Sequence, residues 1–368
     1  MIATFGGAPE PDTNEITTFG KGFGEAVVLH RRGEWFIIDS FYDEPVSDKT
    51  PIAARYLDEL GVPASAVKII VATHWHDDHT PGVSQLYERY SNSKFACAAA
   101  LTTQEFLALA ESTGIAYSGS LKQSRLAEWR KLLSANDFPG RLLSVSAGTS
   151  IWRTQADDFE LYALSPSGAE GLRMQKAIAQ MLPQSGSQQL PPPKRGLPNH
   201  AAIAIVARFG RMCVLLGSDL EVSNIPGCGW GGAISHFTSQ ISTWKSFLFK
   251  VAHHGSVTAH DQSIWKHALE NKPISVLTPF INGSVRLPTS DDVSRVKRLS
   301  SNLLQASVQK VQQKTANSTA QTILNRVGIK VQRYRPSLGA VRVRWKDGID
   351  GIDVQSLGSA LEITGHKS

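Results

Sequence analysis

The loop at residues 73–79, with the sequence THWHDDH, constrains this chain more than any other stretch. It places four candidate metal ligands within six residues: His74, His76, Asp78 and His79. An apolar run at residues 67–72 precedes the loop, and such a run predicts a buried strand. Imidazole suits zinc and its neighbours, and a carboxylate can hold a second, harder ion or a bound water. A polar loop with incidental histidines is the alternative, but this spacing favours a metal site.

Candidate ligands also occur at the ends of three other predicted strands. In chain order they are His200, with Asn199 beside it, before the apolar run 201–207; Asp219 after the strand 213–216; and His253-His254 after the run 247–252. An Asp at the end of a buried strand, where backbone pairing stops, is well placed to bind a metal. The pattern recurs at four strand ends, so we expect these side chains to converge on one site.

The composition is that of a globular chain. Of its 368 residues, 41% are hydrophobic, which is enough for a large core in one or two domains. Cys97, Cys213 and Cys228 lack the spacing of a disulfide or cysteine–zinc framework, so we expect free thiols in a reducing compartment. The start, MIATFGGAPEPD, has neither the basic nor the apolar part of a secretory signal. No apolar run reaches the roughly 18 residues of a bilayer-spanning helix. We therefore expect a cytoplasmic protein without membrane contact.

Secondary structure follows from periodicity and turn residues. The pattern predicts two strands within residues 25–40 joined at 32–34, a helix from Pro51 to Gly61, helical structure over 101–143, a strand at 158–164 and an exposed loop at 183–198. The loop is either a lid over the site or a surface insertion.

The C-terminal part is strongly basic. The net charge is +6, yet residues 291–346 alone hold twelve Lys and Arg against two Asp. Ser290 is a candidate cap for a helix, and the strand 340–346 alternates between an apolar face and a face with Arg342, Arg344 and Lys346. A row of cations suggests an anionic partner such as nucleic acid, with a merely solvated surface as the alternative.

The spacing H-x-H-x-D-H resembles the signature motif of the metallo-β-lactamase superfamily, and later motifs in the chain extend this resemblance. The order SPS, PNHAAIAIVARFG, LLGSDLE and FKVAHHGS is similar to the metallo-β-lactamase-like domain of the DNA-uptake protein ComEC and its soluble relatives. Two departures stand out. Ala202 or a neighbour replaces the serine of N-x-x-S, and the N-x-x-GHP element is reduced to Asn282 followed by residues 286–288. The membrane segments of ComEC are absent, so this chain is not the transporter.

The resemblance implies an α/β fold, a four-layer αββα sandwich of two sheets between helices. We expect residues 1–288 to form the catalytic domain, and residues 289–368 a basic extension of a helix plus strands packed on it.

The resemblance also implies two divalent ions, with zinc favoured and manganese or magnesium as alternatives. His74, His76 and a later residue, either His200 or Asn199, would hold the first ion. Asp78, His79 and His253 would hold the second, with Asp219 bridging. A water shared by two such ions can have a pKa near ~7, so it can act as hydroxide at neutral pH. Asp78 would orient this water, and His254 would either protonate a leaving group or support the ligands.

These expectations favour a metal-dependent hydrolase of the phosphodiesterase or nuclease type, acting on nucleic acid or a nucleotide. One alternative is a hydrolase of a small ester, lactone or thioester. Another is a metal-stabilised binding subunit with a protein partner, for example in a bacterial defence complex.

Overall fold

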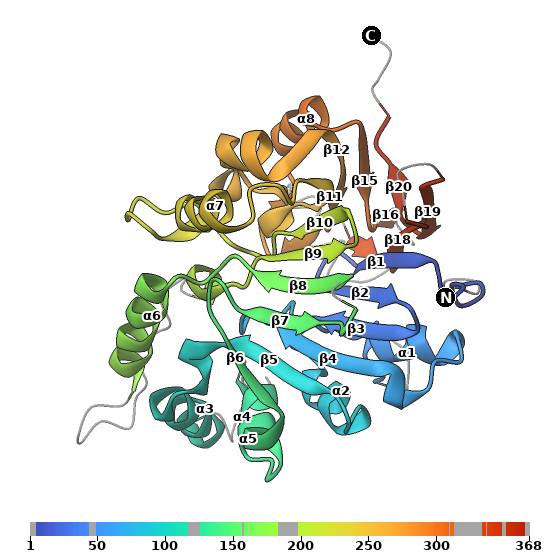
Figure 1. The fold of residues 1–368 in the computed structure, drawn as a ribbon. Helices are drawn as coiled ribbons and strands as arrows, with labels where there is room; N and C mark the ends of the chain where they lie inside the picture. Colours follow the sequence, from blue (N-terminus) through green and yellow to red (C-terminus); the bar gives the residue numbers. More distant parts are fainter. Residues whose placement is uncertain are drawn as a thin grey trace, which may run out of the picture.

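The computed structural model contains two eight-stranded mixed sheets that face each other, with helices on the outer sides (Figure 1). It describes residues 5–43, 49–116, 126–156, 158–182, 198–308, 310–312, 333–335, 337–347 and 351–364. The predicted four-layer αββα sandwich is thereby confirmed. The loop predicted at 183–198 lies outside these residues, apart from Pro198. Within the described part of the chain, no helix has both the length and the apolar character needed to cross a bilayer.

The first sheet is built mainly from the N-terminal third of the chain. In spatial order its strands are β19 (Asp353–Gly358), β18 (Gly339–Trp345), β1 (Asn14–Gly20), β2 (Glu25–Arg31), β3 (Glu34–Ile38), β4 (Val67–Ala72), β5 (Lys94–Ala98) and β6 (Leu142–Val145). Strands β3 to β6 run parallel to one another. A parallel strand is covered on both faces, which explains why the sequence of β4 is almost continuously apolar.

The second sheet comes mainly from the later part of the chain. In spatial order its strands are β20 (Leu361–Glu362), β15 (Asn302–Gln305), β12 (Leu269–Leu277), β11 (Ser246–Lys250), β10 (Met212–Leu216), β9 (Ile205–Phe209), β8 (Phe159–Ala163) and β7 (Ser150–Arg153). Two short hairpins complete the strands: β13 (Phe280–Asn282) with β14 (Val285–Leu287), and β16 (Lys310–Gln312) with β17 (Arg333–Arg335).

The helices divide between the two sheets. Those associated with the first sheet are α1 (Ile52–Glu59), α2 (Val83–Arg89), α3 (Gln104–Ala116), α4 (Ala127–Leu133) and α5 (Phe138–Arg141). Those packed against the second sheet are α7 (Gly229–Gln240) and α8 (Ser290–Leu299). Helix α6 (Gly168–Met181) packs against α3. Most predicted elements are present, with shifted ends.

Two local predictions need correction. The apolar run at 201–207 begins as a 3-10 helix, η3 (Pro198–Ala201), and becomes a strand only at Ile205. The cap of α8 is Thr289 rather than Ser290, because the Thr289 hydroxyl accepts the Asp292 N–H and the Asp292 carboxylate accepts the Thr289 N–H. This reciprocal pair satisfies two backbone donors that the helix leaves free.

The C-terminal strands are part of both sheets. β18 pairs antiparallel with β1 along its whole length, and β15 extends the second sheet beside β12. Trp345 at the end of β18 is buried between the sheets, with ring centroids 5.0 Å from Phe209 and 5.2 Å from Phe247. The domain boundary at residue 288 stays a prediction, but these strands continue the sheets rather than lie on their outside.

The predicted row of free cations on β18 is wrong. Arg342 is buried and donates to the Phe5 carbonyl and to Gln355 Oε1. Arg344 Nε lies 2.7 Å from Glu15 Oε2, and Lys346 Nζ lies 2.8 Å from Asp12 Oδ2. Alternation did predict the apolar face correctly, but on the other face each cation has a partner within the chain, from the N-terminal residues or from β19.

Candidate metal centre

The ligand loop begins where β4 ends. His74, Asp78 and His79 are buried there, and His76 is half-buried. Asp39, which follows β3, holds the loop in place: its two carboxylate oxygens accept the Thr73 N–H and the Thr73 hydroxyl, each at 2.8 Å. Asp39 itself has a left-handed backbone with φ of 61°, a conformation that Asp tolerates better than most residues.

The second sheet supplies the remaining ligands from the ends of β10 and β11. Asp219 follows β10, and His254 lies in the 3-10 turn η4 (Ala252–Gly255) after β11. The Ser218 hydroxyl donates to Thr73 Oγ1 at 2.8 Å and joins this end of the second sheet to the ligand loop. The strand ends of both sheets therefore meet at one place.

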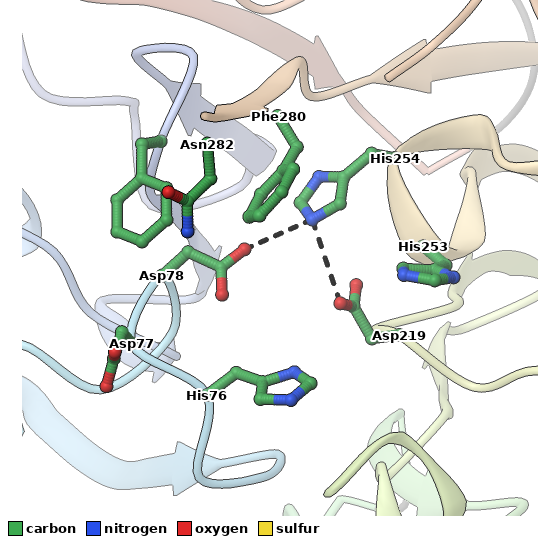
Figure 2. A pocket seen from close by; sticks show the side chains of 9 residues that line it. His76, Asp77, Asp78, Asp219, His253, His254, Phe280 and Asn282 are labelled. Carbon is green, nitrogen blue, oxygen red and sulfur yellow. Dashed lines mark hydrogen bonds and ion pairs between the residues drawn. The ribbon is translucent and has the colours of Figure 1, made fainter. Parts of the chain in front are cut away.

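Two groups of ligand atoms form at this junction, and they share Asp219. One contains His74, His76 and Asp219; the other contains Glu25, His79, Asp219 and His254, and within each group the ligand atoms lie within 4.8 Å of one another. Asp78 adjoins the second group: its Oδ2 lies 3.1 Å from His254 Nε2 (Figure 2). The same oxygen lies 3.6 Å from His79 Nε2. The sequence-predicted residues His74, His76, Asp78, His79, Asp219 and His254 are thus brought together.

The polar atoms at the centre fit a metal ion. His79 Nε2 and Asp219 Oδ1 are buried without a hydrogen-bond partner among the described residues, and they lie 3.5 Å apart. Buried polar atoms rarely remain unpaired in a folded protein. A set of imidazole nitrogens and carboxylate oxygens is the donor set that zinc and similar divalent ions accept.

Charge around His79 supports the same conclusion. Burial alone would lower the pKa of His79, but the carboxylates of Asp78, Asp219 and Asp39 outweigh it and hold that pKa well above the ordinary value. Burial holds the pKa of His74 well below the ordinary value, which keeps its imidazole neutral and able to coordinate. A cation placed among these groups would offset the concentrated negative charge.

Each ligand imidazole of the second group is oriented through its other nitrogen. His79 Nδ1 lies 2.7 Å from Asp39 Oδ2, and His254 Nδ1 lies 2.9 Å from the Thr278 carbonyl oxygen. Both contacts require a proton on Nδ1 when the ring is neutral, which leaves Nε2 free to coordinate. Metal-binding histidines are commonly held in this way.

The structure assigns the second-group position to His254 and not to His253. Both residues have left-handed backbones, with φ of 54° and 45°, and their side chains diverge. His253 Nδ1 lies 2.9 Å from Glu221 Oε1, so this imidazole is held by a carboxylate outside both groups. Sequence reasoning expected His253 as the ligand and His254 in a leaving-group or supporting role, whereas the geometry brings His254 to the other ligands.

The third ligand of the first ion was expected from His200 or its neighbour Asn199. Within the described residues, His200 belongs to neither ligand group and does not line the pocket. Asn199 is buried, its Nδ2 lies 3.4 Å from His253 Nε2, and its Oδ1 has no hydrogen-bond partner among the described residues. Within η3, Asn199 is buried and His200 half-buried, a difference that sequence spacing could not predict.

A cavity of about 160 Å³ opens onto the ligands. It is lined by Phe23, His76, Asp77, Asp78, Asp219, His253, His254, Phe280 and Asn282 (Figure 2). The Phe23 and Phe280 rings lie 5.4 Å apart, and Phe280 stacks on His254 with centroids 5.0 Å apart. Part of the cavity wall is therefore aromatic.

Sequence reasoning missed three carboxylates near the centre: Asp39, Glu25 and Glu221. Asp39 offered one usable signal, because it follows an apolar strand just as Asp219 does. Glu25 starts a strand, and Glu221 lies two residues beyond Asp219, so neither spacing suggested a role.

Comparison with known proteins agrees with this geometry. A family model described as the metallo-beta-lactamase superfamily matches residues 19–121, which include the ligand loop. None of the curated proteins matches the sequence.

Solved structures with some similarity include three chains of low sequence identity. The CmlA beta-hydroxylase E377D mutant is 14% identical, with 72% of this chain and 40% of that chain covered and a TM-score of 0.34. A metallo-beta-lactamase HARLDQ-motif mutant from Cronobacter sakazakii is 15% identical, with 66% of this chain and 77% of that chain covered and a TM-score of 0.37. The metallo-beta-lactamase fold protein YhfI from Bacillus subtilis is 12% identical, with 79% of this chain and 95% of that chain covered and a TM-score of 0.39. The chain spans less than half the length of the CmlA chain.

The family match includes the ligand loop, and the fold places this loop at the edge of two facing sheets with helices outside them. Over residues 19–121, this chain is similar to the metallo-beta-lactamase superfamily.

Proposed function

We propose that this protein is a metal-dependent hydrolase that holds two divalent ions in the two ligand groups. The observation that carries this proposal is the position of Asp219, whose carboxylate belongs to both groups. His74 and His76 would hold one ion, and Asp78, His79 and His254 the other. When bound, such a pair of ions activates water near neutral pH and stabilises negative charge that develops in the reaction.

The protein's own residues would position the substrate and manage one proton. Asp78 faces the cavity and can accept a hydrogen bond from the attacking water. His253 also lines the cavity and is held by Glu221, so we assign it the leaving-group side of the reaction. Burial opposes charge on His253, but Asp219 and Glu221 outweigh it and raise the pKa of this imidazole.

A phosphodiester is the substrate class that we favour. A pair of ions sharing one carboxylate suits displacement at phosphorus, because the attacking and leaving oxygens can both be stabilised. The ComEC-like order of motifs supports the same class by resemblance. The cations of β18 no longer support a long polymer, since their partners lie within the chain, so a nucleotide or a short nucleic-acid segment fits better.

A small ester, lactone or thioester is the second candidate. The aromatic pair Phe23 and Phe280 favours it, because these rings could contact an apolar group of a substrate in a cavity of modest size. A metal-stabilised binding subunit would use the same ligands without turnover.

Turnover assays separate the three candidates. Protein loaded with Zn²⁺ or Mn²⁺ would be incubated with bis-p-nitrophenyl phosphate, single-stranded DNA, RNA, p-nitrophenyl butyrate and a simple lactone. We expect phosphodiester hydrolysis that a chelator abolishes and added metal restores. Hydrolysis of the carboxyl esters alone would shift the assignment to the second candidate, and metal binding without any turnover would favour the binding subunit.

A further inference from the structure

Glu25 and Lys250 form a buried ion pair beside the second ligand group. Lys250 Nζ lies 2.5 Å from Glu25 Oε2, and both side chains are almost fully excluded from solvent. Glu25 begins β2 of the first sheet, whereas Lys250 ends β11 of the second. Two charges removed from water are often less stable than apolar residues of similar size, so stability alone does not explain this pair.

Glu25 contacts the ligand loop directly and reaches His254 through Thr278. Its backbone N–H donates to the Asp78 carbonyl oxygen at 2.9 Å, within the ligand loop. Its carboxylate oxygen Oε2 accepts the Thr278 hydroxyl at 2.5 Å, and the Thr278 carbonyl in turn holds His254 Nδ1 at 2.9 Å. One residue thus joins the Asp78 side of the group to its His254 side.

Lys250 is the charged partner of the Glu25 carboxylate. A carboxylate oxygen of Glu25 lies close enough to His79, Asp219 and His254 to be counted with them as a ligand. The ammonium group of Lys250 offers Oε2 a fixed opposite charge, while the same oxygen holds the Thr278 hydroxyl. The carboxylate is thereby held by Lys250 and by Thr278, the residue that orients His254.

We propose that Glu25 and Lys250 are a positioning pair for the second metal ion, acting through Thr278 on His254. The pair fixes the Thr278 carbonyl, which keeps the proton of His254 on Nδ1 and leaves Nε2 to coordinate. This role rests on the proposed function, because it requires that the second ligand group binds an ion. Loss of a group that orients a metal ligand weakens metal binding by about 10- to 100-fold in comparable sites.

The test measures metal binding rather than turnover. Zn²⁺ would be titrated calorimetrically into metal-free full-length protein, and Co²⁺ would report each site through its visible absorption spectrum. The double substitution Glu25→Gln/Lys250→Met removes the pair without leaving a lone buried charge. Thr278→Val removes only the hydroxyl, and Thr278→Ser retains it.

We expect Glu25→Gln/Lys250→Met and Thr278→Val to weaken binding of the second ion by about 10- to 100-fold. Both variants should also change the Co²⁺ spectrum of that site and leave the affinity for the first ion unchanged. Thr278→Ser should bind like the parent protein. The matched control is Glu15→Gln/Arg344→Met, which removes another ion pair, between the buried Glu15 and the half-buried Arg344, outside both ligand groups. It should lower thermal stability without changing either affinity.

Two results would overturn the positioning role: parent-like binding of the second ion in Glu25→Gln/Lys250→Met and Thr278→Val, or an equal loss in the control. A parent protein that takes up no second ion would instead overturn the two-ion centre of the proposed function, and this proposal with it.

Discussion

Asp219 Oδ1 lies 3.5 Å from His79 Nε2, and both atoms are buried without a hydrogen-bond partner among the described residues. The two residues come from different sheets, at the ends of β10 and β4, so the contact exists only in the folded chain. An imidazole and a carboxylate that face each other in this way leave room for a shared cation. The candidate metal centre thus lies where the two sheets meet.

Asp219→Asn should remove the carboxylate that both ligand groups share. We expect metal content to fall from close to two ions per chain to one or fewer, while the fold is retained because the core is large. Elemental analysis of the purified protein measures the first outcome and circular dichroism the second. Asp77→Asn is the control, since Asp77 lines the cavity but belongs to neither group, and it should keep both ions. Full metal content in Asp219→Asn would remove this residue from the ligand set.

The two adjacent histidines should have separable effects. His254→Ala is expected to lose the second ion, because its Nε2 lies beside Asp78 and Asp219. His253→Ala is expected to keep both ions and to lower kcat by about 100-fold or more, as for the removal of a positioned proton donor. Metal analysis and steady-state kinetics on the same preparations test this, and the reverse assignment would restore His253 as a ligand.

Acid should destabilise the protein through His30. Its Nδ1 lies 2.8 Å from the Thr13 carbonyl oxygen and its Nε2 accepts the Gly33 N–H at 2.8 Å, so the folded protein holds this ring neutral. Burial lowers the pKa of His30 in the folded state, although the Thr13 carbonyl acts in the opposite direction. The unfolded chain therefore binds a proton at His30 more readily than the folded chain. The contribution of His30 to the free energy of unfolding is thus present above pH ~6.5 and is lost as the pH falls below it.

The variant His30→Gln checks this linkage. It should be less stable than the parent at pH 8 by about 1 to 2 kcal/mol, because one or both hydrogen bonds are lost. The difference in free energy of unfolding between parent and variant should then shrink from pH 7 to pH 5, as measured by urea unfolding at each pH. A deficit that stays constant with pH would show that His30 does not contribute to the acid sensitivity.

The cations of β18 should matter for stability rather than for nucleic-acid binding. Arg342→Ala removes a buried side chain that bonds to the Phe5 carbonyl and Gln355, and we expect a loss of about 3 kcal/mol. Lys346→Ala breaks only an exposed pair with Asp12 and should have little effect. The salt dependence of any DNA binding by Lys346→Ala should match the parent. A slope flattened by about 0.7 to 0.9 unit would instead mean that Lys346 contacts phosphate.

The sequence by itself determined the local features of the site. The apolar run of β4 predicted a buried strand, and the spacing of His74, His76, Asp78 and His79 predicted a metal-binding loop after it. Alternation along β18 predicted which face is apolar, and Val341, Val343 and Trp345 are indeed buried. The strand and the apolar face were predicted correctly, and the loop residues do lie together, because hydrophobic periodicity and ligand spacing are properties of a few consecutive residues.

Only the tertiary structure decided which distant residues meet. Local spacing could not choose between His253 and His254, because their left-handed backbone angles direct the two rings to different partners. It could not show that Glu15 and Asp12 neutralise the cations of β18, since strand pairing brings them together across more than three hundred residues. Nor could it place Asp39 on His79 or Glu25 on Lys250. Charged side chains take their partners from the packing of the two sheets, and that packing is a property of the whole chain.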